Sequence, residues 1–152
     1  MLAGALALTG CAAEPPTPPA TADPQPTDPQ PTDTPGSSET TVPQLVPDGT
    51  AEDNLPVFTS AVTEVWNSPD NVSGRAYVDA LVAAGFDKAA MELTADTTPV
   101  GNAAESIQFS VLWGDECLIG QVGPAIGTPV SIVAPALLEG GCLVGETRPI
   151  DW

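Results

Sequence analysis

The chain has 152 residues, with 20 acidic and 3 basic side chains, no histidine, 18 prolines and 3 cysteines. Without histidine the chain cannot form a Ser-His-Asp or Cys-His catalytic site, nor a histidine-ligated metal site. A formal net charge of −17 repels the phosphate backbone, so we expect no nucleic acid partner. The length allows one ordinary domain with additional chain.

The amino-terminal end carries the pattern of an export signal. Residues 1–8 are apolar but too few to span a bilayer, which needs about 20 residues. They lead into Leu8-Thr9-Gly10-Cys11, which resembles the lipobox of bacterial lipoproteins, where small residues precede a cysteine that receives lipid. The resemblance implies that residues 1–10 are a signal peptide and that Cys11 carries the lipid, palmitate included. Such a lipid anchors a protein at the outer, extracytoplasmic face of the cell membrane. The alternative is an incidental cysteine in an apolar segment.

The sequence around Cys11 lacks positive charge. No Lys or Arg precedes Arg75, so the basic region that opens a signal peptide is missing, and we expect the true translation start to lie upstream of Met1. Residues 12–50 hold 11 of the 18 prolines and six acids but no base. Because proline fixes φ and removes a hydrogen-bond donor, we expect residues 11–50 to form a disordered tether rich in Pro, Thr and Asp. A ligand for a proline-binding domain is the alternative.

Residues 51–152 have the composition of a folded domain, since they contain every base and every aromatic residue of the chain. Apolar residues at helical spacing predict a first helix, and its buried face comprises Phe58, Val62, Val65 and Trp66. We expect Asp53 or Asn54 to cap this helix, with Pro56 in its first turn.

A second helix is predicted over residues 74–84. Ser73 is placed to cap its start, and Gly85 is placed to end it in the left-handed conformation. Phe86 then follows as the apolar contact after the helix end.

From Met91 onward the apolar pattern changes to alternation, which predicts strands. Glycine and proline turns separate the expected strands at 91–93, 107–113, 117–122, 130–134 and 142–144. Two helices followed by such strands predict an α+β fold, with two N-terminal helices packed on one face of an antiparallel sheet of about four strands. An all-β sandwich is the alternative, and the two amphipathic segments argue against it.

Two cysteines remain for the domain, Cys117 and Cys142, an even pair in an exported protein. Each begins an expected strand, so a structural disulfide is geometrically reasonable, and it would close a loop of about 26 residues. The alternative is a reactive thiol pair, although such pairs usually sit two residues apart near a helix start.

Patterns for metal binding and catalysis are incomplete. Asp115 with Glu116, and Asp70 with Asn71, offer oxygen ligands for Ca²⁺ but lack the alternating loop of an EF-hand. We therefore expect no metal and no cofactor. The acids show no spacing that identifies a catalytic pair, and without histidine a serine nucleophile would need Lys88 as its base.

The remaining candidate contacts are basic and aromatic. Arg75 and Arg148 are expected to pair with local acids rather than bind an anionic ligand. Trp152 is the candidate for an exposed ligand contact, for example with a carbohydrate, because the other two tryptophans fit the core.

The chain also resembles known proteins. Its lipobox, acidic tether and compact domain look like small cell-envelope lipoproteins of actinobacteria. Within the domain, residues 74–86, 106–111, 114–121 and 142–152 are similar to an actinobacterial domain family of unknown function. The resemblance implies location and domain extent, and it carries no catalytic residues.

From these features we expect a lipid-anchored extracytoplasmic protein that acts as a non-enzymatic binding or structural module of the cell envelope. Its expected partners are the membrane, through Cys11, and an envelope protein or glycan. A carboxylate- or Ser/Lys-dependent envelope hydrolase is the alternative.

Overall fold

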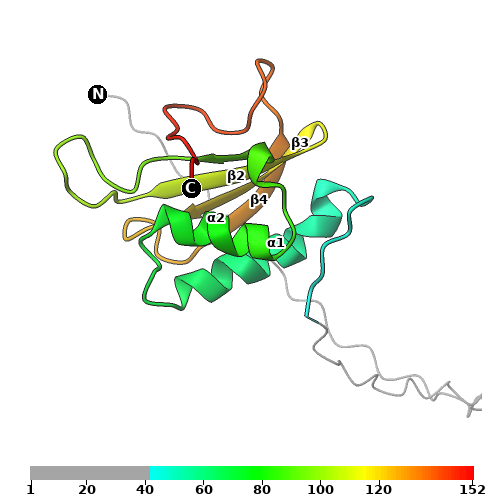
Figure 1. Cartoon of the computed structure of the whole chain (residues 1–152), viewed down its shortest axis with the longest axis horizontal. Coiled ribbons are helices and arrows are strands. Elements are labelled where there is room, and N and C mark those ends of the chain that lie inside the picture. Colours follow the sequence, from blue (N-terminus) through cyan, green and yellow to red (C-terminus); the bar gives the residue numbers. More distant parts are fainter. Residues whose placement is uncertain (1–41) are drawn as a thin grey trace, which may run out of the picture. The chain divides into compact units, whose positions relative to one another are not determined.

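The computed structural model describes residues 42–152. The expected signal peptide, Cys11 and the tether up to residue 41 lie outside the described residues. The described elements follow one another along the chain as Figure 1 shows. They are α1 (Ala51–Trp66), α2 (Gly74–Ala83), the 3-10 turn η1 (Lys88–Ala90), β1 (Met91–Leu93), β2 (Ile107–Trp113), β3 (Glu116–Val122) and β4 (Val130–Pro135).

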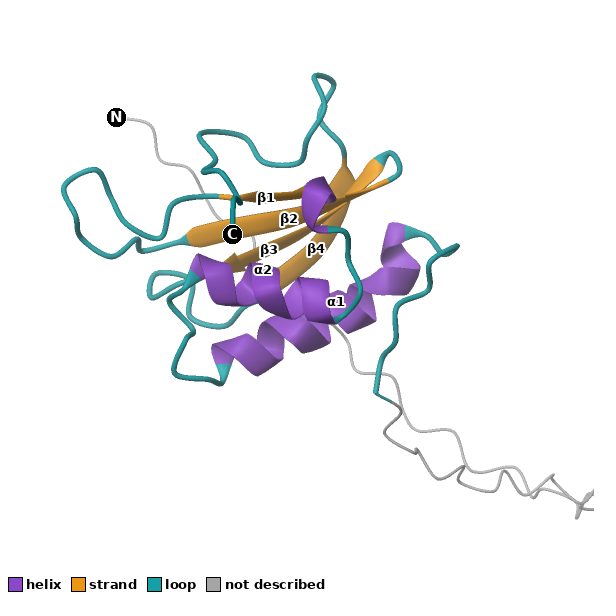
Figure 2. Ribbon diagram, in the orientation of Figure 1, coloured by secondary structure: helices purple, strands orange, loops and turns teal. Residues whose placement is uncertain are grey.

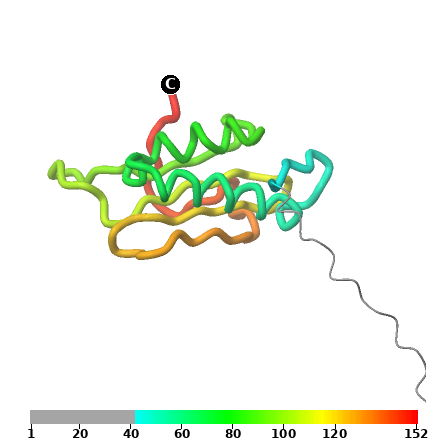
Figure 3. Tube along the Cα trace, turned by 90° about the horizontal axis from the view of Figure 1, so that it is seen from below, coloured from blue at the N-terminus to red at the C-terminus, as the bar shows by residue number. Residues whose placement is uncertain are grey.

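The predicted α+β architecture is confirmed. The four strands form one antiparallel sheet in the order β1-β2-β3-β4, and both helices lie on the same face of it (Figure 2). Figure 3 views the molecule from below, from the side of the helices, with β4 (orange) at one margin of the sheet. The opposite sheet face is called the outer face below.

The start of α1 differs from the prediction. Thr50 is the N-cap, and it forms a capping box with Asp53, whose backbone N–H donates to the Thr50 hydroxyl at 3.2 Å while its carboxylate accepts from the Thr50 N–H at 2.9 Å. Pro56 therefore lies beyond the first turn. Asn54 does not cap the helix. Its buried side chain instead exchanges hydrogen bonds with the backbone of Val46 in the preceding segment.

The second helix was predicted to within a residue. It runs from Gly74 to Ala83 after Ser73 as N-cap residue, but the Ser73 side chain makes no capping hydrogen bond. The free N–H of Gly74 donates instead to the carboxylate of Asp96, at 3.1 Å. Gly85 ends the helix with φ of +103°, as expected, and Phe86 follows into the core.

Strand β2 pairs with β3 through a tight hairpin. Trp113 lies opposite Glu116, so only Gly114 and Asp115 form the turn, and Glu116 already belongs to β3. Gly114 has φ of +62°, which fits the glycine-first position of a type II′ turn. The register from this hairpin places one alternating set of residues, including Val111 and Leu118, under the helices and the other set, including Cys117 and Ile119, on the outer face.

The core between the helices and the sheet is built around aromatic rings. Tyr77 of α2 stacks on Phe109 of β2 with ring centroids 4.7 Å apart, and Phe58 of α1 lies 6.0 Å from Phe109. Phe109 needs a neighbour without a side chain, because a Cβ on its strand partner Gly120 would lie 2.2 Å from the ring. These ring contacts join both helices to β2, while α1 also packs on β3 and β4 and α2 also packs on β1.

The strand expected at residues 142–144 is absent from the structure. Cys142 and Leu143 are buried on the outer face without joining the sheet. The sulfur atoms of Cys117 and Cys142 lie 2.00 Å apart, at disulfide-bond distance. The pair therefore links β3 to a loop.

Candidate functional site

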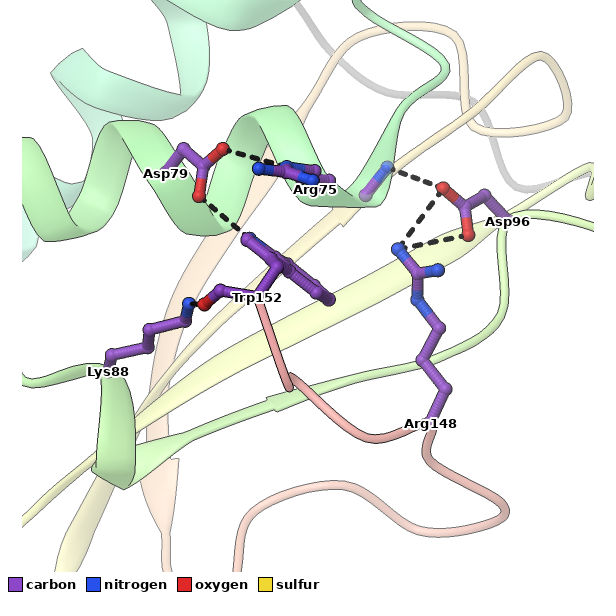
Figure 4. Close-up of polar contacts among 7 residues, drawn as sticks. Arg75, Asp79, Lys88, Asp96, Arg148 and Trp152 are labelled. Carbon is purple, nitrogen blue, oxygen red and sulfur yellow. Dashed lines mark hydrogen bonds and ion pairs between the residues drawn. The ribbon is translucent and has the colours of Figure 1, made fainter.

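Every basic residue of the chain gathers around one tryptophan, and Figure 4 shows the arrangement. The guanidinium carbons of Arg75 and Arg148 each lie 5.3 Å from the centroid of the Trp152 ring, and Nζ of Lys88 lies 4.9 Å from it. Cations at this distance are attracted to the electron-rich face of an indole. We call these four residues, together with Asp79 and Asp96, the Trp152 cluster.

Asp79 joins Trp152 to the exposed side of α2. Its Oδ1 accepts from the indole N–H at 2.9 Å, and its Oδ2 accepts from Nε of Arg75, one helical turn earlier, at 3.2 Å. The hydrogen bond from Trp152, followed by the hydrogen bond and charge of Arg75, holds the pKa of Asp79 below its ordinary value of 3.8. Both Arg75 and Asp79 are more than half exposed, so water weakens their ion pair.

Asp96 forms the second acidic arm of the cluster. It comes from the loop after β1, and its carboxylate lies 3.3 Å from the Arg148 guanidinium while it also caps the start of α2 through Gly74. Nε of Arg148 is buried without a hydrogen-bond partner among the described residues. The expectation that both arginines pair with local acids is confirmed.

The residues that lead to Trp152 cover the edge of β1. The backbone N–H of Arg148 donates to the carbonyl of Leu93 at 2.8 Å, so the segment adds a hydrogen bond to the free side of this short strand. Lys88 then donates from its ammonium group to the main-chain carbonyl of Trp152. The cluster therefore ties β1, η1, α2 and the segment 147–152 together.

Trp152 is half-buried. Three cations and a carboxylate already contact its ring and its N–H, so most of its recognition surface is used inside the molecule. These contacts hold the segment 147–152 against the domain. They also concentrate the positive charge of an acidic protein at one place.

A second polar contact holds the neighbouring loop on the outer face. Oε2 of Glu92 accepts the backbone N–H groups of Cys142 and Leu143 at 2.7 and 2.8 Å. Gly141 is required beside it, since a Cβ there would lie 2.5 Å from the other Glu92 oxygen and φ is +80°. No spacing in the sequence singles out Glu92 among the acids, because its partners lie 50 and 51 positions away.

The other candidate residues are not brought together. Within residues 42–152 no group of three or more acidic or cysteine side chains could hold a metal ion. Lys88 makes no hydrogen bond to a serine in the described part of the chain, and Ser106 accepts instead from Gln121 at 2.8 Å. A shallow hollow of about 610 Å³ is lined by α1, α2 and residues 42–45; five of its 15 lining residues are alanine, and Glu64 and Asp70 are its acidic ones.

No helix among the described residues has both the length and the apolar character needed to cross a membrane.

Comparison with protein families gives one match, to the family described as a domain of unknown function, DUF6993, over residues 62–146. The chain belongs to this family. The DUF6993 match contains both cysteines of the domain, as well as Arg75, Lys88 and Glu92, and it ends before Arg148 and Trp152. No curated protein and no solved structure matches the chain.

Proposed function

We propose that this DUF6993 protein is a lipid-anchored extracytoplasmic protein of an actinobacterial cell envelope, with a folded part that serves as a non-enzymatic binding or structural module. The observation that carries the location is the Cys117–Cys142 pair at bonding distance. Disulfides persist in oxidising compartments and are rare in the cytosol. The lipobox-like Leu8-Thr9-Gly10-Cys11 and the proline-rich tether support the same location from the sequence.

The non-enzymatic role is supported by how the reactive groups are used. Lys88 bonds to the backbone of Trp152, Glu92 accepts two backbone N–H groups, and Asp79 is shared between Trp152 and Arg75. Each group stabilises the fold rather than facing a common cavity. The module would then contact its envelope partner, a protein or a glycan, through its surface, with the tether supplying reach.

The experiment that tests the anchor compares the full-length chain with its Cys11→Ala variant in an actinobacterial host. With an alkyne analogue of palmitate in the medium, we expect the wild-type chain to be labelled and to fractionate with membranes. The variant is expected to lose both properties, because Cys11 is the proposed acceptor of the lipid. A variant that is still labelled, or still retained by membranes, would contradict lipid anchoring.

The location is tested separately from the anchor. Acid quenching of whole cells, followed by thiol alkylation in denaturant and mass measurement, counts the free thiols of the buried Cys117 and Cys142. In an extracytoplasmic protein both are expected to be oxidised and to remain unlabelled. Two alkylated thiols in the folded domain would overturn the assignment to an oxidising compartment.

A further inference from the structure

The β4 edge of the sheet is open, whereas the β1 edge is covered. The N–H of Ala136, just after β4, donates to the main-chain carbonyl of Asp115 at 2.9 Å. Every second residue before it, namely Ala134, Ile132 and Val130, therefore directs its N–H and C=O groups toward β3. In an antiparallel ladder the intervening residues direct their N–H and C=O groups to the other side. The edge therefore presents the backbone groups of Ser131 and Val133, and no described segment lies beside them.

This edge is also the neutral part of a strongly acidic chain. No charged residue occurs from Cys117 to Leu138, a stretch that includes nearly all of β3 and the whole of β4. Natural edge strands usually carry charges that prevent pairing with another chain, and β4 carries none. Two copies of a chain with net charge −17 repel each other over most of their surface, and here they meet the least repulsion.

Apolar side chains line the outer face along the same edge. Ile132 is 46% exposed and Val130 is 42% exposed, and Ile132 lies directly opposite Ile119 in the sheet. With Val144 and Leu143 these residues line a shallow hollow of about 290 Å³. A strand added beside β4 would cover the two exposed side chains.

We propose that the β4 edge binds the β4 edge of a second copy of this chain, in antiparallel orientation, to form one continuous sheet across the dimer. With Ile132 on the two-fold axis, Ser131 and Val133 of one copy pair with Val133 and Ser131 of the second copy. Every N–H and C=O group of these residues is then bonded. Pro129 and Pro135, which have no N–H to donate, fall outside this ladder.

The flanking charges favour the antiparallel orientation. Asp115 and Glu116 lie opposite Ala136 and Pro135, at one end of β4 and one strand in from the open edge. In a parallel pair the acids of the two copies would lie at the same end of the junction, about 14 Å apart across three strand spacings. In the antiparallel pair they lie at opposite ends of the junction, about 20 Å apart at strand spacing, which is well beyond the screening length of about 8 Å at physiological salt.

The test is sedimentation velocity of the full-length chain, produced with Cys11→Ala so that no lipid or detergent contributes, at concentrations up to about 100 µM. We expect a monomer–dimer equilibrium that shifts toward dimer as salt rises, because salt screens the repulsion between the acidic copies. A chain that stays monomeric over the whole range at high salt would overturn the proposal and leave the edge to a different polypeptide.

Charge variants at Ile132 test the register. In the proposed dimer Ile132→Glu and Ile132→Lys each place two like charges opposite one another, so each variant alone is expected to weaken dimerisation at least about tenfold. An equimolar mixture of the two is expected to dimerise again, since Glu and Lys then face each other. Recovery in the mixture also shows that both variants are folded.

Val100→Glu provides the matched control. Val100 is 82% exposed in the loop between β1 and β2, away from β4, so this variant is expected to dimerise like the wild type. A dimer that survives both Ile132 variants, or a mixture that fails to recover although circular dichroism shows folded chains, would place the contact elsewhere and contradict the proposal.

Discussion

The indole N–H of Trp152 donates to Oδ1 of Asp79 at 2.9 Å, across 73 positions of the sequence. This contact fastens the segment that covers the β1 edge to the exposed side of α2. The Trp152 ring is at the same time the meeting point of Arg75, Lys88 and Arg148. The stability of the domain should therefore depend on a residue that lies outside its secondary structure.

Trp152→Ala is expected to lower the free energy of unfolding by about 2 kcal/mol, because a half-buried indole, its hydrogen bond and its cation contacts are lost together. Urea denaturation followed by circular dichroism measures this loss without relying on tryptophan emission. Trp152→Phe keeps a ring but not the N–H, so it should lose about half as much. A change below about 0.5 kcal/mol for Trp152→Ala would show that the contact contributes little.

The two arginines of the Trp152 cluster should differ in their contributions. Arg75→Ala is expected to cost no more than about 0.5 kcal/mol, because its ion pair with Asp79 is solvent-exposed. Arg148→Ala should cost about 1–2 kcal/mol, since Arg148 is less exposed, neutralises the half-buried Asp96 and packs on Trp152. Paired urea titrations test the order, and equal losses would contradict it.

Glu92→Gln should loosen the loop that follows β4. The carboxylate holds two backbone N–H groups through one oxygen, and a neutral amide makes weaker bonds, so we expect a loss of about 1–2 kcal/mol. Hydrogen exchange read by mass spectrometry should show faster exchange at Cys142 and Leu143. Glu105→Gln, at an exposed position, is the control, and unchanged exchange in Glu92→Gln would contradict the role assigned to its charge.

Reduction of the Cys117–Cys142 pair is expected to lower the free energy of unfolding by about 3.5 kcal/mol by the chain-entropy estimate, given a sequence separation of 25. The comparison uses Cys11→Ala protein with and without reductant, so that only this pair changes. Cys117→Ala with Cys142→Ala should show a similar loss and no response to reductant. A reductant effect that persists in this double variant would have another origin.

The pH dependence of stability should have an alkaline component from Tyr77. Its side chain is fully buried, and burial raises its pKa from 10.0 to about 12. Between these values the unfolded chain releases the phenol proton and the folded chain keeps it. The contribution of the protonated Tyr77 to the free energy of unfolding is thus fully present below pH 10. It is lost as the pH rises toward the folded-state pKa, by on the order of 2 kcal/mol.

Tyr77→Phe isolates this component, because it removes the titrating group and keeps the ring that stacks on Phe109. The variant loses the hydrogen bond to the carbonyl of Asn71, about 1 kcal/mol at neutral pH. Its further loss of stability between pH 10 and 12 should be smaller than that of the wild type in urea titrations at matched pH. Parallel losses would show that Tyr77 does not cause the alkaline effect.

Local patterns in the sequence were sufficient for most of the fold. Alternation over residues 107–113 and helical spacing from Phe58 to Trp66 reflect faces that pack on one common core, so the α+β arrangement followed from them. The N-cap of α1 did not, because Thr50, Asp53 and Asn54 are all good capping residues. A nonlocal contact with Val46 decides which of them caps the helix.

The candidate site was less predictable, because its contacts are long-range. Residues 142–144 have the apolar character of a strand. Two of their N–H groups donate to the Glu92 carboxylate, so they are not available for hydrogen bonds to a neighbouring strand. The sequence predicts that Arg75 and Arg148 pair with local acids. The three bases meet at Trp152 only because separate segments of the chain come together in the fold, and no spacing in the sequence predicts this.

The gathering of all three bases at Trp152 has a consequence for proteolysis. Trypsin-like proteases cleave after Lys and Arg, and the bond after Arg148 is protected because Pro149 follows it. The remaining sites, after Arg75 in α2 and after Lys88 in η1, both lie within the Trp152 cluster. Because Arg75 lies in α2 and Lys88 in η1, such a protease cuts the folded chain only when one of these two elements opens locally, so its cleavage rate reports the local stability of the elements that hold Trp152.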